Sequence, residues 1–438
     1  MRDGLPGRGD IRRGQEILGG HGILQRMRNL CGGMPGKGYR DGTGGAMMKK
    51  VLEGSRAVAE AVKICRPNVI SAYPITPQTH IVENLSQMVA DGELKSEFIN
   101  VESEFAAASV ILGASATGAR AYSTTTSQGL LLMLEVLFNI AGLRLPVSIT
   151  CANRSVSAPI NIWNDHQDAM TIRDSGWIQL YAEDCQEAAD MQIQAFKIGE
   201  NPEISLPVMV NMDGFILTHA FEPVELIDPK MADKFLPAYK PKQYLTTKDP
   251  MTFGILAEPA YYMETRYRLV QAVDAAKPVI DDVANEFNKT FGRYSGGLVD
   301  KYRLDGAKTA LVGMGSVVGT MREVVDELRD KGQNVGLLKV RAFRPFPKEA
   351  IFDALKDVDT IIVFEKALSL GFGGILLNEM KTVFYGKKKQ PRFCGFLVGL
   401  GGRDIPNQSI IDAVGKAESE TVEDQFVDLR TELIGIGE

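Results

Sequence analysis

Residues 68–79 read NVISAYPITPQT. The first five, Asn68–Ala72, are β-branched or small and predict a short strand. Two prolines follow, and because proline fixes its own backbone dihedral they hold Thr76 rigidly between them. Ligands of open α/β sheets bind where strands end. The Thr76 hydroxyl is therefore a candidate to bind a small carboxylate or carbonyl, although a helix cap at Thr76 or Thr79 explains the same residues.

Strands and helices alternate on either side of this stretch. The sequence predicts further strands at Phe98–Val101, Ala121–Thr124, Pro146–Ala152 and Leu206–Asn211, and helices at Val51–Ile64, Glu104–Ala116 and Leu130–Ala141. Such alternation is typical of a parallel sheet with helices on both faces. We therefore expect an α/β domain over residues 47–220.

A second α/β domain is expected over residues 306–438, after a linker and helical connection at 221–305. The predicted elements are a strand near Ala310–Gly313, a helix at Val317–Lys331, strands at Val335–Val340 and Thr360–Phe364, and a helix at Gly371–Val383. Gly313 and Gly315 follow a strand, as in dinucleotide-binding folds. The third glycine and the closing acidic residue of that fingerprint are missing, which argues against a nicotinamide site.

Residues 1–46 differ from the rest of the chain, because they hold 14 of its 44 glycines and many arginines. We expect a disordered extension, or a misassigned start with translation beginning at Met47 or Met48.

Composition excludes several classes of protein. The net charge of -6 argues against nucleic acid as a partner. No apolar run reaches the roughly 18 residues of a membrane helix. The five cysteines are odd in number and lack a CxxC pair, which predicts a reducing cytoplasm and no iron–sulfur cluster held by this chain alone. The four histidines are scattered and predict no metal site.

Glu104 follows a predicted strand and opens an apolar helix. Its carboxylate would complement the dipole of that helix. Walled by apolar neighbours, it would also be desolvated and able to share a proton with a heterocyclic nitrogen. The residues alone favour neither reading.

Two further segments carry polar side chains at strand ends. Ser123–Ser127, with Gln128 and Gly129, suits either cofactor binding through backbone N–H groups or ordinary helix capping. Arg154 follows a buried strand and suits a bidentate contact with a carboxylate, or a structural ion pair with Asp165 or Asp168. We interpret His166 as structural.

Taken in order and spacing, these segments resemble the alpha subunits of pyruvate:ferredoxin oxidoreductase (pyruvate synthase) and its 2-oxoacid:acceptor oxidoreductase relatives. The resemblance runs from about Lys49 to the C-terminus. Its markers are Tyr73–Thr79, Glu102–Glu104, Thr125–Leu130, Asn153–Arg154, Asn164–His166 and Gly399–Ile405.

The resemblance implies the kind of each domain. Residues 47–220 correspond to the pyrimidine-binding domain of thiamine diphosphate enzymes, and residues 306–438 to a transketolase C-terminal-like domain. The diphosphate-binding domain with its Mg²⁺ would lie on a beta subunit. Iron–sulfur clusters would lie on partner chains, which include gamma and ferredoxin-like delta subunits.

It also implies an activity. Members convert a 2-oxo acid and coenzyme A to acyl-CoA and carbon dioxide, and the electrons leave through the clusters. Glu104 matches the glutamate that hydrogen-bonds N1′ of the aminopyrimidine ring. Thr76 and Arg154 match the substrate-binding residues, and Tyr73, Pro74, Ser127 and Gln128 are expected to contact the cofactor.

Two residues, Phe105 and Trp163, depart from the family pattern. The identity of the 2-oxo acid substrate therefore stays open. Pyruvate is expected first; an aromatic (phenylglyoxylate-like), branched-chain or dicarboxylic 2-oxo acid is the alternative. Two other classes compete with this activity, namely a thiamine enzyme that passes acyl groups to a lipoyl arm and a non-catalytic scaffold.

Overall fold

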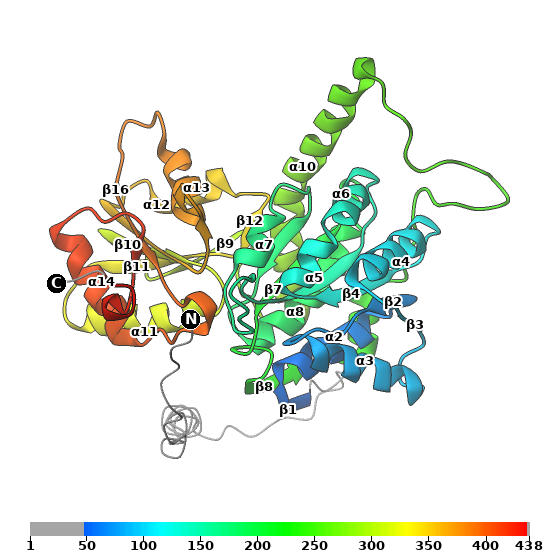
Figure 1. The fold of residues 1–438 in the computed structure, drawn as a ribbon, viewed down its shortest axis with the longest axis horizontal. Helices are drawn as coiled ribbons and strands as arrows, with labels where there is room; N and C mark the ends of the chain where they lie inside the picture. Colours follow the sequence, from blue (N-terminus) through cyan, green and yellow to red (C-terminus); the bar gives the residue numbers. More distant parts are fainter. Residues whose placement is uncertain (1–47, 436–438) are drawn as a thin grey trace, which may run out of the picture. The chain divides into compact units, whose positions relative to one another are not determined.

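A seven-stranded sheet organises the first half of the chain in the computed structural model, which describes residues 48–435 (Figure 1). Its strands, in spatial order, are β12 (Ala342–Arg344), β6 (Ile178–Tyr181), β7 (Val208–Asp213), β5 (Ser148–Asn153), β4 (Ala121–Thr125), β2 (Val69–Ala72) and β3 (Glu97–Asn100). All neighbours are parallel except β12, which runs antiparallel to β6. Because parallel strands point the same way, the loops after β2, β4 and β5 meet at one edge.

Helices cover both faces of this sheet, as the sequence predicts. On β7, Val208 and Val210 belong to a buried cluster with helices α2 (Gly54–Cys65), α3 (Thr79–Ala90) and α8 (Cys185–Gly199). Met209 lies between them in sequence and belongs to the opposite cluster, with α4 (Glu104–Ala116), α5 (Ser127–Leu132) and α6 (Leu134–Gly142). Successive side chains on a strand alternate between its faces, so each face buries its own core. Figure 1 shows these two groups of helices on opposite sides of the strands.

A six-stranded sheet organises the second half. Its order is β17 (Gln425–Phe426), β16 (Arg392–Leu397), β13 (Thr360–Glu365), β10 (Thr309–Gly313), β11 (Val335–Val340) and β9 (Val299–Tyr302), and only β9 is antiparallel to its neighbour. Helices α12 (Lys348–Leu355) and α13 (Ile375–Phe384) cover one face, and α11 (Val317–Asp330) and α14 (Asn407–Ser419) the other. The molecule is thus an α/β protein with two mainly parallel sheets.

The remaining regular elements lie between or beside these layers. They are β1 (Met48–Glu53), α7 (Gln167–Thr171), β8 (Phe221–Leu226), α9 (Pro229–Phe235), α10 (Pro259–Phe291), β14 (Leu368–Ser369), β15 (Gly373–Gly374) and the 3-10 turns Leu400–Gly402 and Thr431–Leu433. Within residues 48–435, no helix combines the length and apolarity needed to cross a lipid bilayer.

Several sequence expectations need correction. The helix expected from Val51 begins only at Gly54, because residues 48–53 form β1 and pair antiparallel with β8. The helix expected over Leu130–Ala141 is two helices that meet at Met133. The predicted linker 221–258 contains β8 and α9, and β9 precedes the expected domain start at residue 306. The extension 1–46 lies outside the described residues.

Buried charges join the two sheets. Glu187 on α8 accepts hydrogen bonds from Lys339 Nζ at 2.6 Å and from Arg341 Nε at 3.0 Å, both at the end of β11. The three side chains are at most 2% exposed. A second connection places Asp213, at the end of β7, 2.7 Å from Lys366 Nζ just after β13. Charges are seldom buried unless paired, so these contacts fix how the sheets meet.

Candidate active site

The loop after β2 and the loop after β5 meet through Arg154. Its Nη1 donates to the backbone oxygen of Thr76 at 2.8 Å, and its Nε donates to the backbone oxygen of Asn161 at 3.0 Å. Arg154 is 6% exposed. No ion pair or side-chain hydrogen bond to Nη2 is found within residues 48–435, so the ion pair with Asp165 or Asp168 considered from the sequence is not formed. One edge of the guanidinium remains for a ligand.

Thr76 does not cap a helix. Helix α3 begins at Thr79 after Gln78, and no side chain caps it. Thr76 is exposed beside Arg154, and its hydroxyl makes no hydrogen bond to any residue that the structure describes. The cap considered from the sequence is therefore absent, and the hydroxyl is free to meet a ligand.

Asp168 holds the loop after β4 against the loop after β5. Its carboxylate accepts the backbone N–H of Ser127 at 3.0 Å and of Arg154 at 2.9 Å. Burial raises the pKa of Asp168. Ser127, at φ 46°, also donates from its hydroxyl to the backbone oxygen of Ser155 at 2.5 Å. Sequence reasoning considered Asp168 only as a partner of the Arg154 guanidinium, and its backbone contacts carry no sequence signal.

Glu104 opens α4, where Ser103 caps the helix by accepting the N–H of Ala106 at 3.2 Å. Its side chain is 7% exposed, and no cation or donor pairs with it among residues 48–435. The carboxylate lies against Gly129, where a Cβ atom would stand 2.6 Å from Glu104 Oε1 and 2.7 Å from Thr125 Oγ1. A side chain at position 129 would therefore collide with the carboxylate, so the glycine allows α5 to lie this close to Glu104.

Several buried polar atoms at this edge of the sheet also lack partners among residues 48–435. They include Thr125 Oγ1 and Gln78 Oε1. Gln78 Nε2 meanwhile donates to the backbone oxygens of Tyr73 and Thr124, at 3.0 and 2.9 Å, which ties the loop after β2 to β4. Buried polar groups are nearly always hydrogen-bonded, so orphans grouped at one sheet edge indicate a missing polar ligand. A flat heterocycle with ring nitrogens and an amino group fits such a set of donors and acceptors.

The predicted site residues thus gather at one edge of the first sheet, but not all in direct contact. Arg154 contacts Thr76, and the Ser127 hydroxyl oxygen lies 2.6 Å from the Gln128 side-chain amide. Tyr73 and Pro74 are exposed on the loop after β2. Three further candidate site residues lie at this edge, and the sequence suggested no individual role for any of them: Gln78, Thr125 and Gly129.

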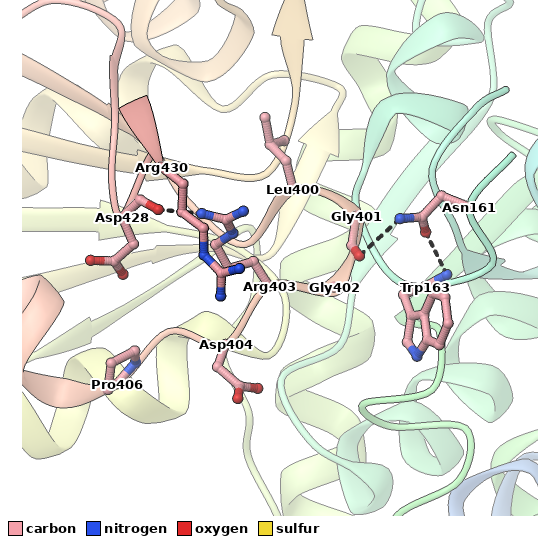
Figure 2. A pocket seen from close by; sticks show the side chains of 10 residues that line it. All are labelled: Asn161, Trp163, Leu400, Gly401, Gly402, Arg403, Asp404, Pro406, Asp428 and Arg430. Carbon is pink, nitrogen blue, oxygen red and sulfur yellow. Dashed lines mark hydrogen bonds between the residues drawn. The ribbon is translucent and has the colours of Figure 1, made fainter. Parts of the chain in front are cut away.

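A pocket of about 670 Å³ opens beside this edge (Figure 2). It lies between the loop Asn161–Trp163 and the turn Leu400–Gly402, where Asn161 Nδ2 donates to Gly401 O at 3.1 Å. Its lining carries charges of both signs, from Arg403, Arg430, Asp404 and Asp428. None of the predicted site residues lines this pocket, but Asn161 links it to Arg154 through the hydrogen bond described above.

Asn164 and His166 lie at the contact between the sheets. Lys366 Nζ donates to Asn164 Oδ1 at 3.0 Å, and His166 Nε2 lies 2.7 Å from Asp213 Oδ1. The neighbouring Lys366 and His166 hold the pKa of Asp213 well below its usual range despite its burial. A Cβ on Gly315 would stand 2.9 Å from Asp213 Oδ1, so this glycine serves close packing between the sheets, not a nucleotide.

Comparisons with known proteins agree with this arrangement. Residues 60–285 match the family "Pyruvate flavodoxin/ferredoxin oxidoreductase, thiamine diP-bdg", and residues 307–410 match "Pyruvate:ferredoxin oxidoreductase core domain II". The pyruvate synthase subunit PorA of Methanosarcina barkeri is 54% identical over 391 residues, which cover 88% of this chain and 97% of that protein. The ketoisovalerate oxidoreductase subunit VorA of Pyrococcus abyssi is 42% identical over 88% of this chain and 97% of that protein.

A solved structure shares the fold. The 2-oxoglutarate:ferredoxin oxidoreductase from Magnetococcus marinus, with 2-oxoglutarate, coenzyme A and succinyl-CoA bound, superposes with a TM-score of 0.63 at 18% identity. The match covers 84% of this chain and 65% of that one. The family resemblance inferred from the motifs is confirmed: the chain belongs to the pyruvate flavodoxin/ferredoxin oxidoreductase family, and its first half matches the thiamine diphosphate-binding part of that family.

Proposed function

We propose that this chain is the alpha subunit of a pyruvate synthase. The complex converts pyruvate and coenzyme A to acetyl-CoA and carbon dioxide and passes two electrons to a ferredoxin-type acceptor. The observation that carries the proposal is the Glu104 carboxylate, which is 7% exposed, has no partner in the described residues, and lies against Gly129, where any side chain would collide with it. The 54% identity to a pyruvate synthase subunit supports pyruvate as the substrate.

Thiamine diphosphate is the cofactor whose pyrimidine ring fits the orphaned polar atoms. When bound, it supplies a carbon nucleophile that adds to the 2-oxo carbon and then stabilises the negative charge left by decarboxylation. Glu104 would hold the proton at N1′ of that ring, in the role of the family glutamate that it matches. Ser127, Gln128, Tyr73 and Pro74 line the ring as cofactor-binding residues.

Thr76 and Arg154 hold the 2-oxo acid. The Arg154 guanidinium uses two donors on the backbone oxygens of Thr76 and Asn161, and this fixes its plane. Its free edge then binds the substrate carboxylate, while the Thr76 hydroxyl donates to the carboxylate or the 2-oxo oxygen. Fixed donors of this kind lower the entropic cost of orienting a substrate.

The remaining parts of the enzyme complex are assigned to partner chains. A beta subunit contributes the diphosphate-binding domain and its Mg²⁺, and gamma and ferredoxin-like delta subunits complete the complex with the iron–sulfur clusters. Within the chain, the first sheet with its helices is assigned to the pyrimidine-binding domain, and the second sheet, which includes β9, to the transketolase C-terminal-like domain. We assign the complex to the cytoplasm, on the spacing of the cysteines.

A branched-chain 2-oxo acid is the second candidate substrate. The 42% identity to a ketoisovalerate oxidoreductase subunit, at the same coverage, favours it over aromatic or dicarboxylic acids. The substrate carboxylate and 2-oxo group are shared by all these acids, so Thr76 and Arg154 keep their roles whichever is used.

Substitution of Arg154 tests the substrate site. In the assembled complex, Arg154→Lys should raise KM for pyruvate about 10-fold to 100-fold, with a smaller loss in kcat, because an ammonium cannot bridge two backbone oxygens and a carboxylate at once. Steady-state kinetics over a range of pyruvate concentrations measure both constants. The matched control is Arg303→Lys, an exposed arginine paired with Asp326, which should leave KM unchanged. An unaltered KM in Arg154→Lys would remove Arg154 from the substrate site.

A further inference from the structure

Three potential metal ligands converge near the start of α3, a helix that packs on the opposite face of the first sheet from α4. One ligand atom each from Glu53, His80 and His219 lies within 4.8 Å of the others. The three residues come from the end of β1, the first turn of α3 and the segment between β7 and β8. None of them belongs to the candidate active site, and their distance in sequence explains why the histidines gave no metal prediction.

Hydrogen bonds fix the backbone that carries two of these ligands. Gly54 N donates to Ala220 O at 3.0 Å, and Ser55 donates to Thr218 O from its N–H at 3.0 Å and from its hydroxyl at 2.8 Å. Glu53 and His219 are the residues adjacent to these bonds. The carboxylate and the imidazole are therefore held on two facing segments, before any ion binds.

The ring nitrogens are arranged as in metal-binding histidines. His80 Nδ1 lies 2.7 Å from Glu53 Oε1, and His219 Nδ1 lies 2.7 Å from Thr218 Oγ1. The two ring centroids are 4.7 Å apart.

We propose that Glu53, His80 and His219 bind one divalent cation of the zinc class. Two imidazoles and a carboxylate are a ligand set of zinc sites with an open fourth position. With bonds of about 2.0–2.1 Å, the ligand atoms around a tetrahedral zinc lie about 3.4 Å apart. Side-chain rotations that move the ligand atoms by about 1 Å would bring them to this spacing. Arg56, three residues after Glu53, is engaged with Glu60 and Asn84.

Such an ion would connect β1, α3 and the segment after Asp213. Phe215 lies 4.7 Å from the His219 ring and 6.0 Å from the Trp163 ring, between centroids, and Trp163 lines the pocket of Figure 2. The site therefore stabilises a segment that leads toward the contact between the sheets. Binding of the ion does not depend on catalysis, so the metal site can be tested independently of the proposed activity.

Zinc titration of the untagged, chelator-treated full-length chain tests the proposal. Competition with a chromogenic chelator should give one equivalent of Zn²⁺ bound with a submicromolar Kd, and Co²⁺ should give the visible absorption of a tetrahedral site. His80→Ala and His219→Ala should each weaken Zn²⁺ binding by about 100-fold or more, since loss of even an outer-shell partner costs 10-fold to 100-fold.

Two controls separate this site from others. Glu83→Gln removes an exposed carboxylate from the same helix, and His21→Ala removes a histidine outside the described residues; both should bind Zn²⁺ as the wild type does. Circular dichroism checks that each variant is folded, and Glu53→Gln replaces any histidine variant that is not. The proposal would be overturned if the wild type bound less than about 0.2 equivalent of Zn²⁺, which is about one-fifth occupancy of a site for one ion. Unchanged Zn²⁺ binding in the folded ligand variants would also overturn it.

Discussion

Glu104→Gln in the assembled complex should lower kcat for pyruvate oxidation by about 100-fold to 1,000-fold, the usual contribution of a positioned acid–base group. The amide preserves the size of the side chain in the space beside Gly129 but cannot take up or release a proton at the ring nitrogen. Binding of pyruvate should change little, because Thr76 and Arg154 are untouched. Viologen reduction under anaerobic conditions measures kcat and KM.

The control for this experiment is Glu102→Gln, two residues earlier and exposed to solvent. It should retain the wild-type kcat. Thiamine diphosphate content should be determined for both variants, so that loss of chemistry is distinguished from loss of cofactor. A Glu104→Gln complex that keeps its cofactor and turns over within tenfold of the wild type would mean that Glu104 is not the proton-sharing group.

The second large effect is expected on stability. Glu187→Gln should lower the free energy of unfolding by roughly 3–5 kcal/mol, the cost of removing one partner from a buried ion pair. Glu187 lies 2.6 Å from Lys339 and 3.0 Å from Arg341, and none of the three is more than 2% exposed. The amide leaves a buried guanidinium without its carboxylate. Urea denaturation of the full-length chain, followed by far-ultraviolet circular dichroism, measures the loss.

An exposed pair provides the comparison. Glu327→Gln removes the partner of Lys331 at 2.7 Å, where both side chains are more than 40% exposed. Its cost should stay below about 1 kcal/mol, as for other surface pairs. If Glu187→Gln cost no more than Glu327→Gln, the buried network would not be what joins the two sheets.

The local elements could be predicted because they depend on nearby residues. Helix α4 begins and ends where the sequence indicates, since Ser103 supplies the cap and the apolar run Glu104–Ala116 the helix. Strands β2 and β11 also fall within a residue of their predicted bounds, because fully buried strands appear as apolar runs. Strand β6 was missed, as was β12, which crosses over to pair with it. Such pairing depends on residues more than 150 positions apart, and no local pattern encodes it.

The sequence could suggest candidate site residues but not their connections. Glu104, Thr76 and Arg154 were chosen because they follow predicted strands and match positions of the family, and the first sheet brings those strand ends to one edge. The contact of Arg154 with the Thr76 carbonyl, and the role of Asp168 in holding two loops, involve backbone atoms that every residue has. Gly129 could be recognised as necessary only once the Glu104 carboxylate was located against it.

The central claim is that this chain carries the acid–base half of a 2-oxoacid oxidoreductase that uses pyruvate. Anaerobic viologen reduction by the native complex, with coenzyme A and a panel of pyruvate, 2-oxoisovalerate, phenylglyoxylate and 2-oxoglutarate, tests it most directly. We predict a kcat/KM for pyruvate about tenfold or more above that for each other acid, a ratio that pocket contacts with one or a few carbons can supply. Preference for 2-oxoisovalerate would contradict the assignment of pyruvate, and no reduction with any of the four acids would contradict the catalytic role itself.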